Sequence, residues 1–412
     1  MIPKLNDYKE RFQIDSVSVI KPGLDSMRKA LENAGNPEKD LRIIHVAGTN
    51  GKGSTIAFME AMLKEHGYKT GVFSSPALYD VHDQIRFDGR PIRQEEMERS
   101  FEKMKEAGVS GLLTDFELLT VAAFVAFERN KPDYVLLECG MGGTLDSTNV
   151  VTPIVSVITT IAKDHESFLG NTIREIAKHK AGIIKETVPV IAGELPREAE
   201  EVIRKKAFLE QSNLLLYGTD FKMCMDETEI FSGSRQIPLQ NRRMKGPHQG
   251  MNCAVAIQAL LSANVPLQND KIVKAVEQAQ LPFRFQEVAP NIFLDGAHNP
   301  AAAKVLAETI RKEFPGEKVD FVIGMLSTKD IRATLDELIP VASSFTFLPF
   351  SHPSAASTEM LLACCNHPVK RAEISNDETI ILKTINGKKK IVAGSLYLLA
   401  GLLNHTHIRL EL

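Results

Sequence analysis

The sequence predicts an α/β protein of two domains, and three observations carry this prediction. Short β-branched runs alternate with helix-like segments along most of the 412 residues, a pattern typical of parallel sheets with helices on both faces. The alternation is interrupted at 214–245 and starts again near residue 291. The length is that of two or three domains. We predict a P-loop-type, mostly parallel sheet domain covered by helices at 1–288, and a smaller, Rossmann-like α/β domain at 289–412.

The N-terminal elements follow from residue periodicity and composition. The run RIIHV (42–46) is typical of a buried strand, and the segment STIAFMEAMLKEHG after the next turn has apolar residues at helical spacing. Residues 214–245 contain short alternating segments and turn residues, which predict an antiparallel excursion. Further strands are predicted at TGVF (70–73), YVLLE (134–138), PIVSVIT (153–159) and VPVIAG (188–193), and helices at FELLTVAAFVAFERN (116–130) and TIREIAKHKAGIIK (172–185).

The C-terminal elements repeat the same rhythm. A helix is predicted at GMNCAVAIQALLSA (250–263), and we place the domain boundary after it, in QEVAP (286–290). Strands are predicted within NIFLD (291–295), VDFVIGM (319–325), SFTFLPF (344–350) and KKKIVAG (388–394).

Composition and charge limit the class of protein. With 43% hydrophobic and 25% charged residues, the chain resembles an ordinary soluble globular protein. Its net charge of −3 gives no general electrostatic reason to bind nucleic acid. The N-terminus lacks the apolar core of a secretory signal, and the most apolar helical run is too short to span a bilayer. The five scattered cysteines favour a reducing compartment, so we expect a cytoplasmic monomer without nucleic-acid or membrane partners.

The segment HVAGTNGKGST (45–55) carries the clearest chemical signal. It joins a predicted strand to a predicted helix, where glycines let backbone N–H groups approach a phosphate and the helix N-terminus favours negative charge. Lys52 can reach the outer phosphates, and the hydroxyl of Ser54 or Thr55 can bind Mg²⁺. The spacing differs from the Walker pattern because Gly53 separates the lysine from the hydroxyl residue. A glycine turn without a ligand is the alternative, and the context favours a nucleotide site.

Polar residues at the ends of neighbouring strands predict a metal site beside this loop. Glu138 ends a predicted strand, and Ser75 and His165 each follow another, at the edge where open α/β sheets bind ligands. A carboxylate there suits a hard cation such as Mg²⁺. Taken alone, Glu138 could be a solvated carboxylate and His165 a structural histidine. Lys180 lies in a lysine-rich helical segment, where composition alone favours a solvated helix face. Asp146 alone is more typical of a loop cap.

The C-terminal domain presents a second set of polar residues. Arg284 stands at its entrance, and Asp295, His298 and Asn299 follow the first predicted strand. Ser395 follows the last predicted strand in the same way. Two domains with polar strand ends predict a site in the cleft between them.

Seven motifs together resemble one known family. The motifs HVAGTNGKGST, SSP, ECGMGGTLDSTN, DHESFLGNTIREIAKHKAGIIK, HQGMNCAVA, DGAHNP and GSLYL occur in this order. They are similar to those of folylpolyglutamate synthases and bifunctional dihydrofolate synthases, which belong with the Mur cell-wall ligases. The resemblance extends from about residue 20 to about residue 400, and the loop at 45–55 is then a variant of this superfamily.

The resemblance implies a set of site residues, with ATP, two Mg²⁺ sites and a carbamylated lysine as cofactors. Lys52, Glu138, His165 and Lys180 would take part in catalysis, Lys180 as the carbamylated metal ligand. The residues implied to contact ATP are Thr49, Asn50, Gly51, Lys52, Gly53, Ser54, Asn252, Arg284 and Asp295. The implied metal ligands are Ser54, Ser75, Glu138, His165 and Lys180. The residues implied to contact folate or glutamate are Phe116, Glu117, Asp146, Ser147, His298 and Ser395, and the segment KPG (21–23) would lie near the pterin.

The chain departs from the family pattern at three places. Phe283 stands where the family often has glycine before the arginine, and Thr144 stands where Arg, Asp or Lys is common. Asp83-Gln84 replaces the usual glutamate before the isoleucine. These departures affect the expected substrate preference and leave the phosphate loop unchanged.

The resemblance also implies the reaction, which is ATP-dependent amide-bond formation. The carboxylate of a folate, or of dihydropteroate, would attack the γ-phosphorus of ATP, and the amine of L-glutamate would then displace phosphate. Two rivals are a Mur-type ligase acting on a nucleotide-linked cell-wall precursor and a nucleotide-switch NTPase without ligase activity. The central motifs fit the folate branch better than the first rival, and the polar cluster DGAHNP argues against the second.

Overall fold

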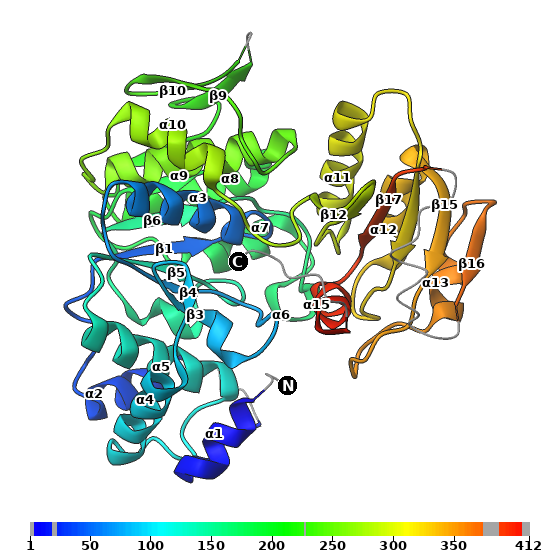
Figure 1. Ribbon diagram of the computed structural model, residues 1–412. Coiled ribbons are helices and arrows are strands. Elements are labelled where there is room, and N and C mark those ends of the chain that lie inside the picture. The colour runs from blue at the N-terminus through cyan, green and yellow to red at the C-terminus, as the bar shows by residue number, and fades with distance from the viewer. Residues whose placement is uncertain (1–3, 19–22, 226–227, 374–386, 406–412) are drawn as a thin grey trace. The chain divides into compact units, whose positions relative to one another are not determined.

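The computed structural model of the protein describes residues 4–18, 23–225, 228–373 and 387–405 (Figure 1). The chain divides into two compact units, each described here by itself. Unit 1 comprises Met1–Arg242 and Met251–Ala279, and unit 2 comprises Arg243–Gly250 and Gln280–Leu412.

Unit 1 is built on an eight-stranded sheet of order β4-β3-β2-β5-β1-β6-β7-β8. All neighbours from β2 to β8 in this order are parallel, and β3 and β4 form an antiparallel edge. Every residue of β1 and β5 is buried, as expected for continuous apolar runs in a parallel sheet. The strands are β1 Ile43–Ala47, β2 Thr70–Phe73, β3 Ile85–Phe87, β4 Arg90–Pro91, β5 Tyr134–Glu138, β6 Val155–Ile158, β7 Val190–Ala192 and β8 Leu214–Leu216.

Helices cover both faces of this sheet, with α3 on one side and α5 on the other (Figure 1). Helix α5 begins with a capping box, in which Thr114 accepts from the Glu117 N–H and Glu117 accepts from the Thr114 N–H. The helices are α1 Leu5–Phe12, α2 Asp25–Asn33, α3 Lys52–Glu65, α4 Gln94–Glu106, α5 Asp115–Asn130, α6 Glu166–Leu169, α7 Ile173–Ala181, α8 Arg197–Leu209, α9 Pro247–Ser262 and α10 Asn269–Gln278. Helix α9 begins in unit 2 and continues in unit 1.

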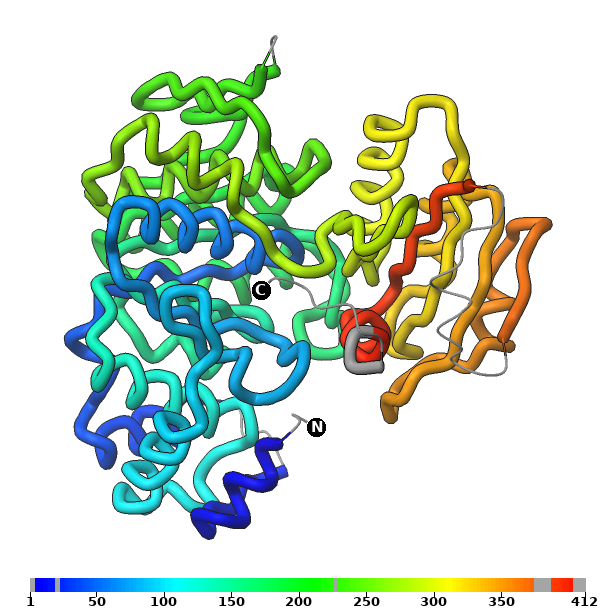
Figure 2. Tube along the Cα trace, in the orientation of Figure 1, coloured from blue at the N-terminus to red at the C-terminus, as the bar shows by residue number. Residues whose placement is uncertain are grey.

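The antiparallel excursion is shorter than the sequence predicts. Strand β8, the first part of the 214–245 stretch, pairs in parallel with β7 and completes the main sheet, because helix α8 provides the crossover that a parallel strand needs. The antiparallel part is a three-stranded sheet beside α10 (Figure 2), made of β9 Lys222–Met225, β10 Glu229–Ser232 and β11 Gln236–Leu239.

Unit 2 contains a six-stranded sheet of order β12-β13-β17-β14-β15-β16. Among the described strands of this sheet, only β12 and β13 pair in antiparallel orientation. The stretch QEVAP (286–290), where the sequence predicts a domain boundary, contains β12 and lies inside this unit. The strands are β12 Gln286–Ala289, β13 Ile292–Leu294, β14 Val319–Ile323, β15 Ala342–Phe347, β16 Lys370–Ala372 and β17 Lys390–Ala393, and the helices are α11 Pro300–Glu313, α12 Ile331–Leu338, α13 Thr358–Cys364 and α15 Leu396–His405.

The predicted fold class, a mostly parallel sheet domain with helices followed by a smaller α/β domain, is confirmed. Across the described ranges, no helix combines the length and hydropathy that a membrane span requires.

Candidate functional site

The glycine loop joins β1 to α3, as predicted, and its glycines are required by close packing. Gly51 caps the helix with φ 88°, in the left-handed region that favours glycine. A Cβ at Gly51 would lie 2.5 Å from Asn252 Oδ1, and a Cβ at Gly48 would lie 1.9 Å from Thr159 Oγ1. A side chain at either position would therefore force the loop, or the Asn252 or Thr159 side chain beside it, to shift.

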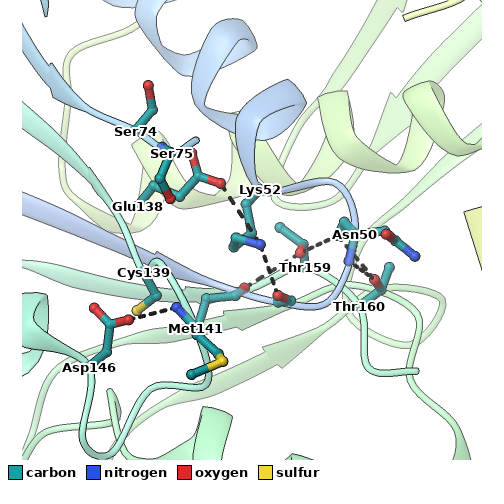
Figure 3. A network of polar contacts seen from close by, with 12 residues as sticks. Asn50, Lys52, Ser74, Ser75, Glu138, Cys139, Met141, Asp146, Thr159 and Thr160 are labelled. Atoms are coloured by element: carbon teal, nitrogen blue, oxygen red, sulfur yellow. Dashed lines mark hydrogen bonds and ion pairs between the residues drawn. The ribbon is translucent and has the colours of Figure 1, made fainter. Parts of the chain in front are cut away.

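Two threonines after β6 hold the glycine loop in place (Figure 3). The Thr49 N–H donates to the Thr160 carbonyl at 2.8 Å, and the Asn50 N–H donates to Thr160 Oγ1 at 3.1 Å. The carbonyl of Asn50 accepts from Thr159 Oγ1 at 2.6 Å and from Thr160 Oγ1 at 3.0 Å. Thr159 and Thr160 are not among the residues predicted for the site. Their signal was available, since two hydroxyl residues directly follow a strand next to the phosphate loop.

Lys52 and Glu138 meet at the carboxyl edge of the parallel sheet (Figure 3). Lys52 Nζ lies 3.8 Å from Glu138 Oε1 and donates to the Gly48 carbonyl at 3.2 Å. Glu138 Oε2 accepts from the Ser75 N–H at 3.4 Å, so the ends of β2 and β5 are joined at this point. Ser54, in the first turn of α3, is buried. The structure thus brings together three sequence-predicted residues, Lys52, Ser75 and Glu138.

His165 lies at a more open position than the other predicted ligands. It precedes α6 with φ 53°, and its side chain is 47% exposed. Its Nε2 is 3.9 Å from Asp164 Oδ1. In the part of the chain that the structure describes, no three His, Cys, Asp or Glu side chains form a ready metal cluster. The donor set around Glu138 still suits Mg²⁺, which usually takes one or two carboxylates and completes its shell with water and substrate phosphates.

Lys180 is buried, which corrects the expectation from composition of a solvated helix face. Its exposed fraction is 3%, whereas Lys178 on the same helix is exposed. Burial, reinforced by the nearby Lys52 charge, lowers the pKa of Lys180 to about 7. The sequence could not show which of these lysines is buried, because three of the eight residues 178–185 are lysine.

The loop after β5 packs tightly against the end of the helix that carries Lys180. A Cβ at Gly143 would lie 2.5 Å from the His179 carbonyl, and the Thr144 N–H donates to the same carbonyl at 2.7 Å. Asn149 Nδ2 donates to the Thr144 and Gly182 carbonyls, each at 3.1 Å. The contacts to the His179 and Gly182 carbonyls lie at the C-terminus of this helix, where carbonyl groups lack partners within the helix.

Asp146 and Ser147, two predicted folate contacts, are engaged inside the protein. Asp146 is buried and accepts from the Met141 N–H at 2.7 Å, from the Thr148 N–H at 3.0 Å and from Thr148 Oγ1 at 2.5 Å. Burial raises the pKa of Asp146, and these hydrogen bonds oppose the rise. Ser147 Oγ lies 2.7 Å from Thr120 Oγ1. The geometry supports the loop-cap interpretation of Asp146.

The other two predicted folate contacts of unit 1 lie in the first turn of α5. The Glu117 carboxylate accepts from the Thr114 N–H at 2.7 Å and from Thr114 Oγ1 at 2.8 Å. The centroid of the Phe116 ring lies 5.6 Å from that of the Phe73 ring. A Cβ at Gly140 would lie 2.6 Å from the nearest atoms of the Phe116 ring. Of the KPG segment (21–23), Lys21 and Pro22 lie outside the described residues.

The buried His45 makes stability sensitive to acid. Complete burial lowers the pKa of His45 to about 3, well below the value near 6.5 of an exposed histidine. Below pH 6.5 the unfolded chain takes up a proton that the folded chain does not, so stability falls as the pH drops. Between pH 6.5 and pH 5 the loss should be about 2 kcal/mol.

Urea unfolding of the wild type and of His45→Gln at pH 7, 6 and 5 measures this effect. The variant lacks the titrating group, so the stability difference between the two proteins should shift in favour of the variant as the pH falls. If the difference in unfolding free energy between the two proteins stays constant from pH 7 to pH 5, the low pKa of His45 is wrong.

Unit 2 places Arg284 and Asp295 together. Asp295 accepts from the Phe285 N–H and the Ala297 N–H, each at 2.9 Å. Burial raises the pKa of Asp295, and the Arg284 charge opposes the rise. Arg284 also lines a cavity of about 380 Å³ within unit 2, together with Phe285, Phe293 and Phe314.

The residue before this arginine explains one departure from the family pattern. Phe283 has φ 62°, a left-handed conformation that glycine adopts without strain and that other residues adopt rarely. Its side chain is completely buried. The burial of a large aromatic ring thus offsets the cost of a conformation that would favour glycine.

His298 and Ser395 follow β13 and β17, two adjacent parallel strands of unit 2. His298 Nδ1 lies 2.8 Å from the Gly296 carbonyl, so Nδ1 carries the proton and donates it. Ser395 is buried and its Oγ accepts from the Tyr397 N–H at 3.2 Å, at the start of α15. Both predicted glutamate contacts therefore lie at the carboxyl edge of this sheet.

Comparisons with known proteins show which family the chain resembles. The Mur ligase middle domain family matches residues 46–260, and the family described as dihydrofolate synthetase, C-terminal domain, matches residues 279–405. A dihydrofolate synthase/folylpolyglutamate synthase of Bacillus subtilis is 35% identical, over 92% of this chain and 94% of its own length.

Solved structures give the same result. Escherichia coli FolC in complex with DHPP and ADP has a TM-score of 0.88 at 30% identity, covering 97% of each chain. A bifunctional folylpolyglutamate synthase/dihydrofolate synthase with Mn, AMPPNP and L-glutamate bound has a TM-score of 0.85 at 30% identity, covering 94% of this chain and 95% of that chain. The phosphate loop, the buried strand-end residues and these matches over nearly the whole length lead to one conclusion: this chain belongs to the dihydrofolate synthase/folylpolyglutamate synthase family.

Proposed function

We propose that the protein joins L-glutamate to the terminal carboxylate of a folate, using ATP and releasing ADP and phosphate. The observation that carries this proposal is the placement of Lys52 beside Glu138, at the end of a braced phosphate loop and at the carboxyl edge of a parallel sheet. A lysine at a helix N-terminus acts on the outer phosphates of a nucleotide, which suits transfer of the γ-phosphoryl group to a carboxylate.

The loop residues Thr49 to Ser54 would hold the ATP phosphates. Ser54, Ser75 and Glu138 would hold divalent metal, with His165 as a further ligand. Bound Mg²⁺ would neutralise charge that develops on the phosphate oxygens. The chain's own contribution is a loop whose backbone is already held at Thr49 and Asn50 by Thr159 and Thr160, so little reorganisation of the loop is needed on binding.

Lys180 would act as a carbamate. Its pKa of about 7 leaves a large fraction of the amine unprotonated at neutral pH, as reaction with CO₂ requires. In the carbamate, the buried positive charge is replaced by a carboxylate-like group, which suits a neighbourhood that already contains Lys52 and would hold a cation.

Residues of unit 2 would complete the substrates' contacts. Arg284 and Asp295, together with Asn252 of unit 1, would contact the nucleotide, and His298 and Ser395 would contact L-glutamate. The assignment of ATP binding to residues 1–288 and of glutamate ligation to 289–412 is part of this proposal, as are a cytoplasmic location and a monomeric state.

Dihydropteroate is a second candidate acceptor. One observation favours it, since the E. coli FolC structure contains DHPP and relatives that match most of this chain carry both activities in their names. Incorporation of labelled glutamate into dihydropteroate and into tetrahydrofolate, measured side by side, separates one activity from two.

An oxygen-labelling experiment tests the proposed reaction. If the folate carboxylate receives the γ-phosphoryl group, ¹⁸O placed in that carboxylate should appear in the released inorganic phosphate, because the glutamate amine then displaces that phosphate. An adenylating enzyme would transfer the label to AMP. Label in AMP, or label in neither product during glutamate-dependent turnover, would rule out the acyl-phosphate route.

A further inference from the structure

A chain of buried hydrogen bonds connects β1 to the loop after β5. His45 Nε2 lies 2.8 Å from Thr148 Oγ1 and 3.1 Å from Cys139 Sγ. Thr148 Oγ1 in turn lies 2.5 Å from Asp146 Oδ1. The other oxygen of Asp146 accepts from the Met141 N–H, across the same loop (Figure 3). All the linking side chains, from His45 to Asp146, are buried.

The donors in this chain have one consistent direction. The Asp146 carboxylate accepts from the Thr148 hydroxyl, so His45 Nε2 carries the proton, and Nδ1, which is buried without a hydrogen-bond partner, is the unprotonated nitrogen. Nε2–H then donates to Thr148 Oγ1, and the Thr148 hydroxyl is left to donate to the Asp146 carboxylate. Each group is oriented by the one before it, and low local polarity makes each bond costly to lose.

The two ends of this series of hydrogen bonds lie next to two different loops, one of which is the phosphate loop. His45 is in β1, the strand that leads into the phosphate loop at 48–53. Asp146 closes the loop 139–146, which begins directly after Glu138 and contains Leu145, a large apolar residue that is 51% exposed. A shift of the second loop relative to the first would break the hydrogen bonds between them.

We propose that His45 and Thr148 are positioning residues, which act through Asp146 to hold the 139–146 loop in the orientation that receives the pterin-bearing substrate. The proposal rests on the proposed function, and it takes this loop as part of the folate site because the resemblance implies folate contacts at Asp146 and Ser147. Neither His45 nor Thr148 touches the substrate, so their effect should appear in the KM for that substrate rather than in the KM for ATP.

Thr148→Val tests this proposal, since it removes the hydroxyl and keeps the shape of the side chain. We expect the KM for the folate or pteroate substrate to rise about tenfold, as for loss of one buried hydrogen bond, with the KM for ATP changed less than about twofold. Thr148→Ser, which retains the hydroxyl, should restore the wild-type value. At His45, Gln can place its amide nitrogen near the Nε2 position and should retain function, whereas Asn places it near Nδ1 and should not.

Thiol labelling gives a readout that does not depend on activity. Cys139 is 1% exposed and touches His45 and Thr148, so its alkylation rate reports on the loop. In Thr148→Val the rate at Cys139 should rise, while Cys253, buried in α9, serves as the internal control and should not change. Equal labelling of Cys139 in wild type and Thr148→Val would overturn the proposal, as would faster labelling with an unchanged substrate KM.

The two hypotheses fail in different ways. If the wild type ligates glutamate to neither folates nor dihydropteroate, the proposed function fails. The substrate role of the loop then fails with it, even if Cys139 labelling still shows that Thr148 holds the loop. If the wild type is active and only the substrate KM is insensitive to Thr148→Val, the proposed function stands and the positioning role is wrong.

Discussion

Replacing Lys52 with alanine is expected to lower the turnover number of glutamate ligation by about 100-fold or more. The ammonium group lies at the N-terminus of α3, 3.8 Å from the Glu138 carboxylate, where charge would develop on the transferred phosphoryl group. Removing it takes away transition-state stabilisation of several kcal/mol, roughly the value of one well-placed donor in a catalytic site. Steady-state kinetics with saturating ATP measures the effect on turnover directly.

The matched control is Lys64→Ala, on the same helix. Lys64 is exposed, so this variant loses the same charge and the same side-chain length away from the phosphate loop. It should retain near-normal turnover, and both variants should melt close to the wild type. Turnover of Lys52→Ala within a few-fold of the wild type would contradict the role assigned to Lys52.

Replacing Lys180 with alanine is expected to abolish ligation, and small carboxylic acids such as acetate should restore part of the activity. The physical reason is that the carbamate would supply an anionic oxygen that alanine lacks, and an added carboxylate can occupy the same space. In forming the carbamate, the unprotonated Nζ attacks the carbon of CO₂, a C–O π pair moves to oxygen, and the amine proton leaves to solvent. Activity should therefore also depend on bicarbonate.

Two measurements test this prediction: ¹³C NMR and the activity of Lys180→Ala without an added acid. ¹³C NMR of the wild type in labelled bicarbonate should show a carbamate signal that Lys180→Ala lacks and that Lys178→Ala, at an exposed position of the same helix, retains. The carbamate would be wrong if the signal is absent from active enzyme, or if Lys180→Ala remains active without an added acid.

The sequence predicted those features that local physics controls. The strand, glycine turn and helix around the 45–55 segment follow from periodicity and from the backbone freedom of glycine, so the phosphate loop could be located from its residues alone. The capping box at Thr114 and Glu117 is also local, but it was not among the predicted features, because the resemblance assigns Glu117 to the substrate. The family itself was recognisable because its motifs are long and keep their order.

Only the tertiary structure decided which side chains are withdrawn from water. Lys180 and Lys178 are two residues apart and equivalent by composition, yet packing against the loop at 143–144 buries one and leaves the other in solvent. The partners of His45 lie 94 and 103 residues away in the sequence, so no local pattern could reveal the buried hydrogen bonds that join them. The low pKa values of Lys180 and His45 follow from this burial, because desolvation depends on what surrounds a group in space and not on its neighbours in sequence.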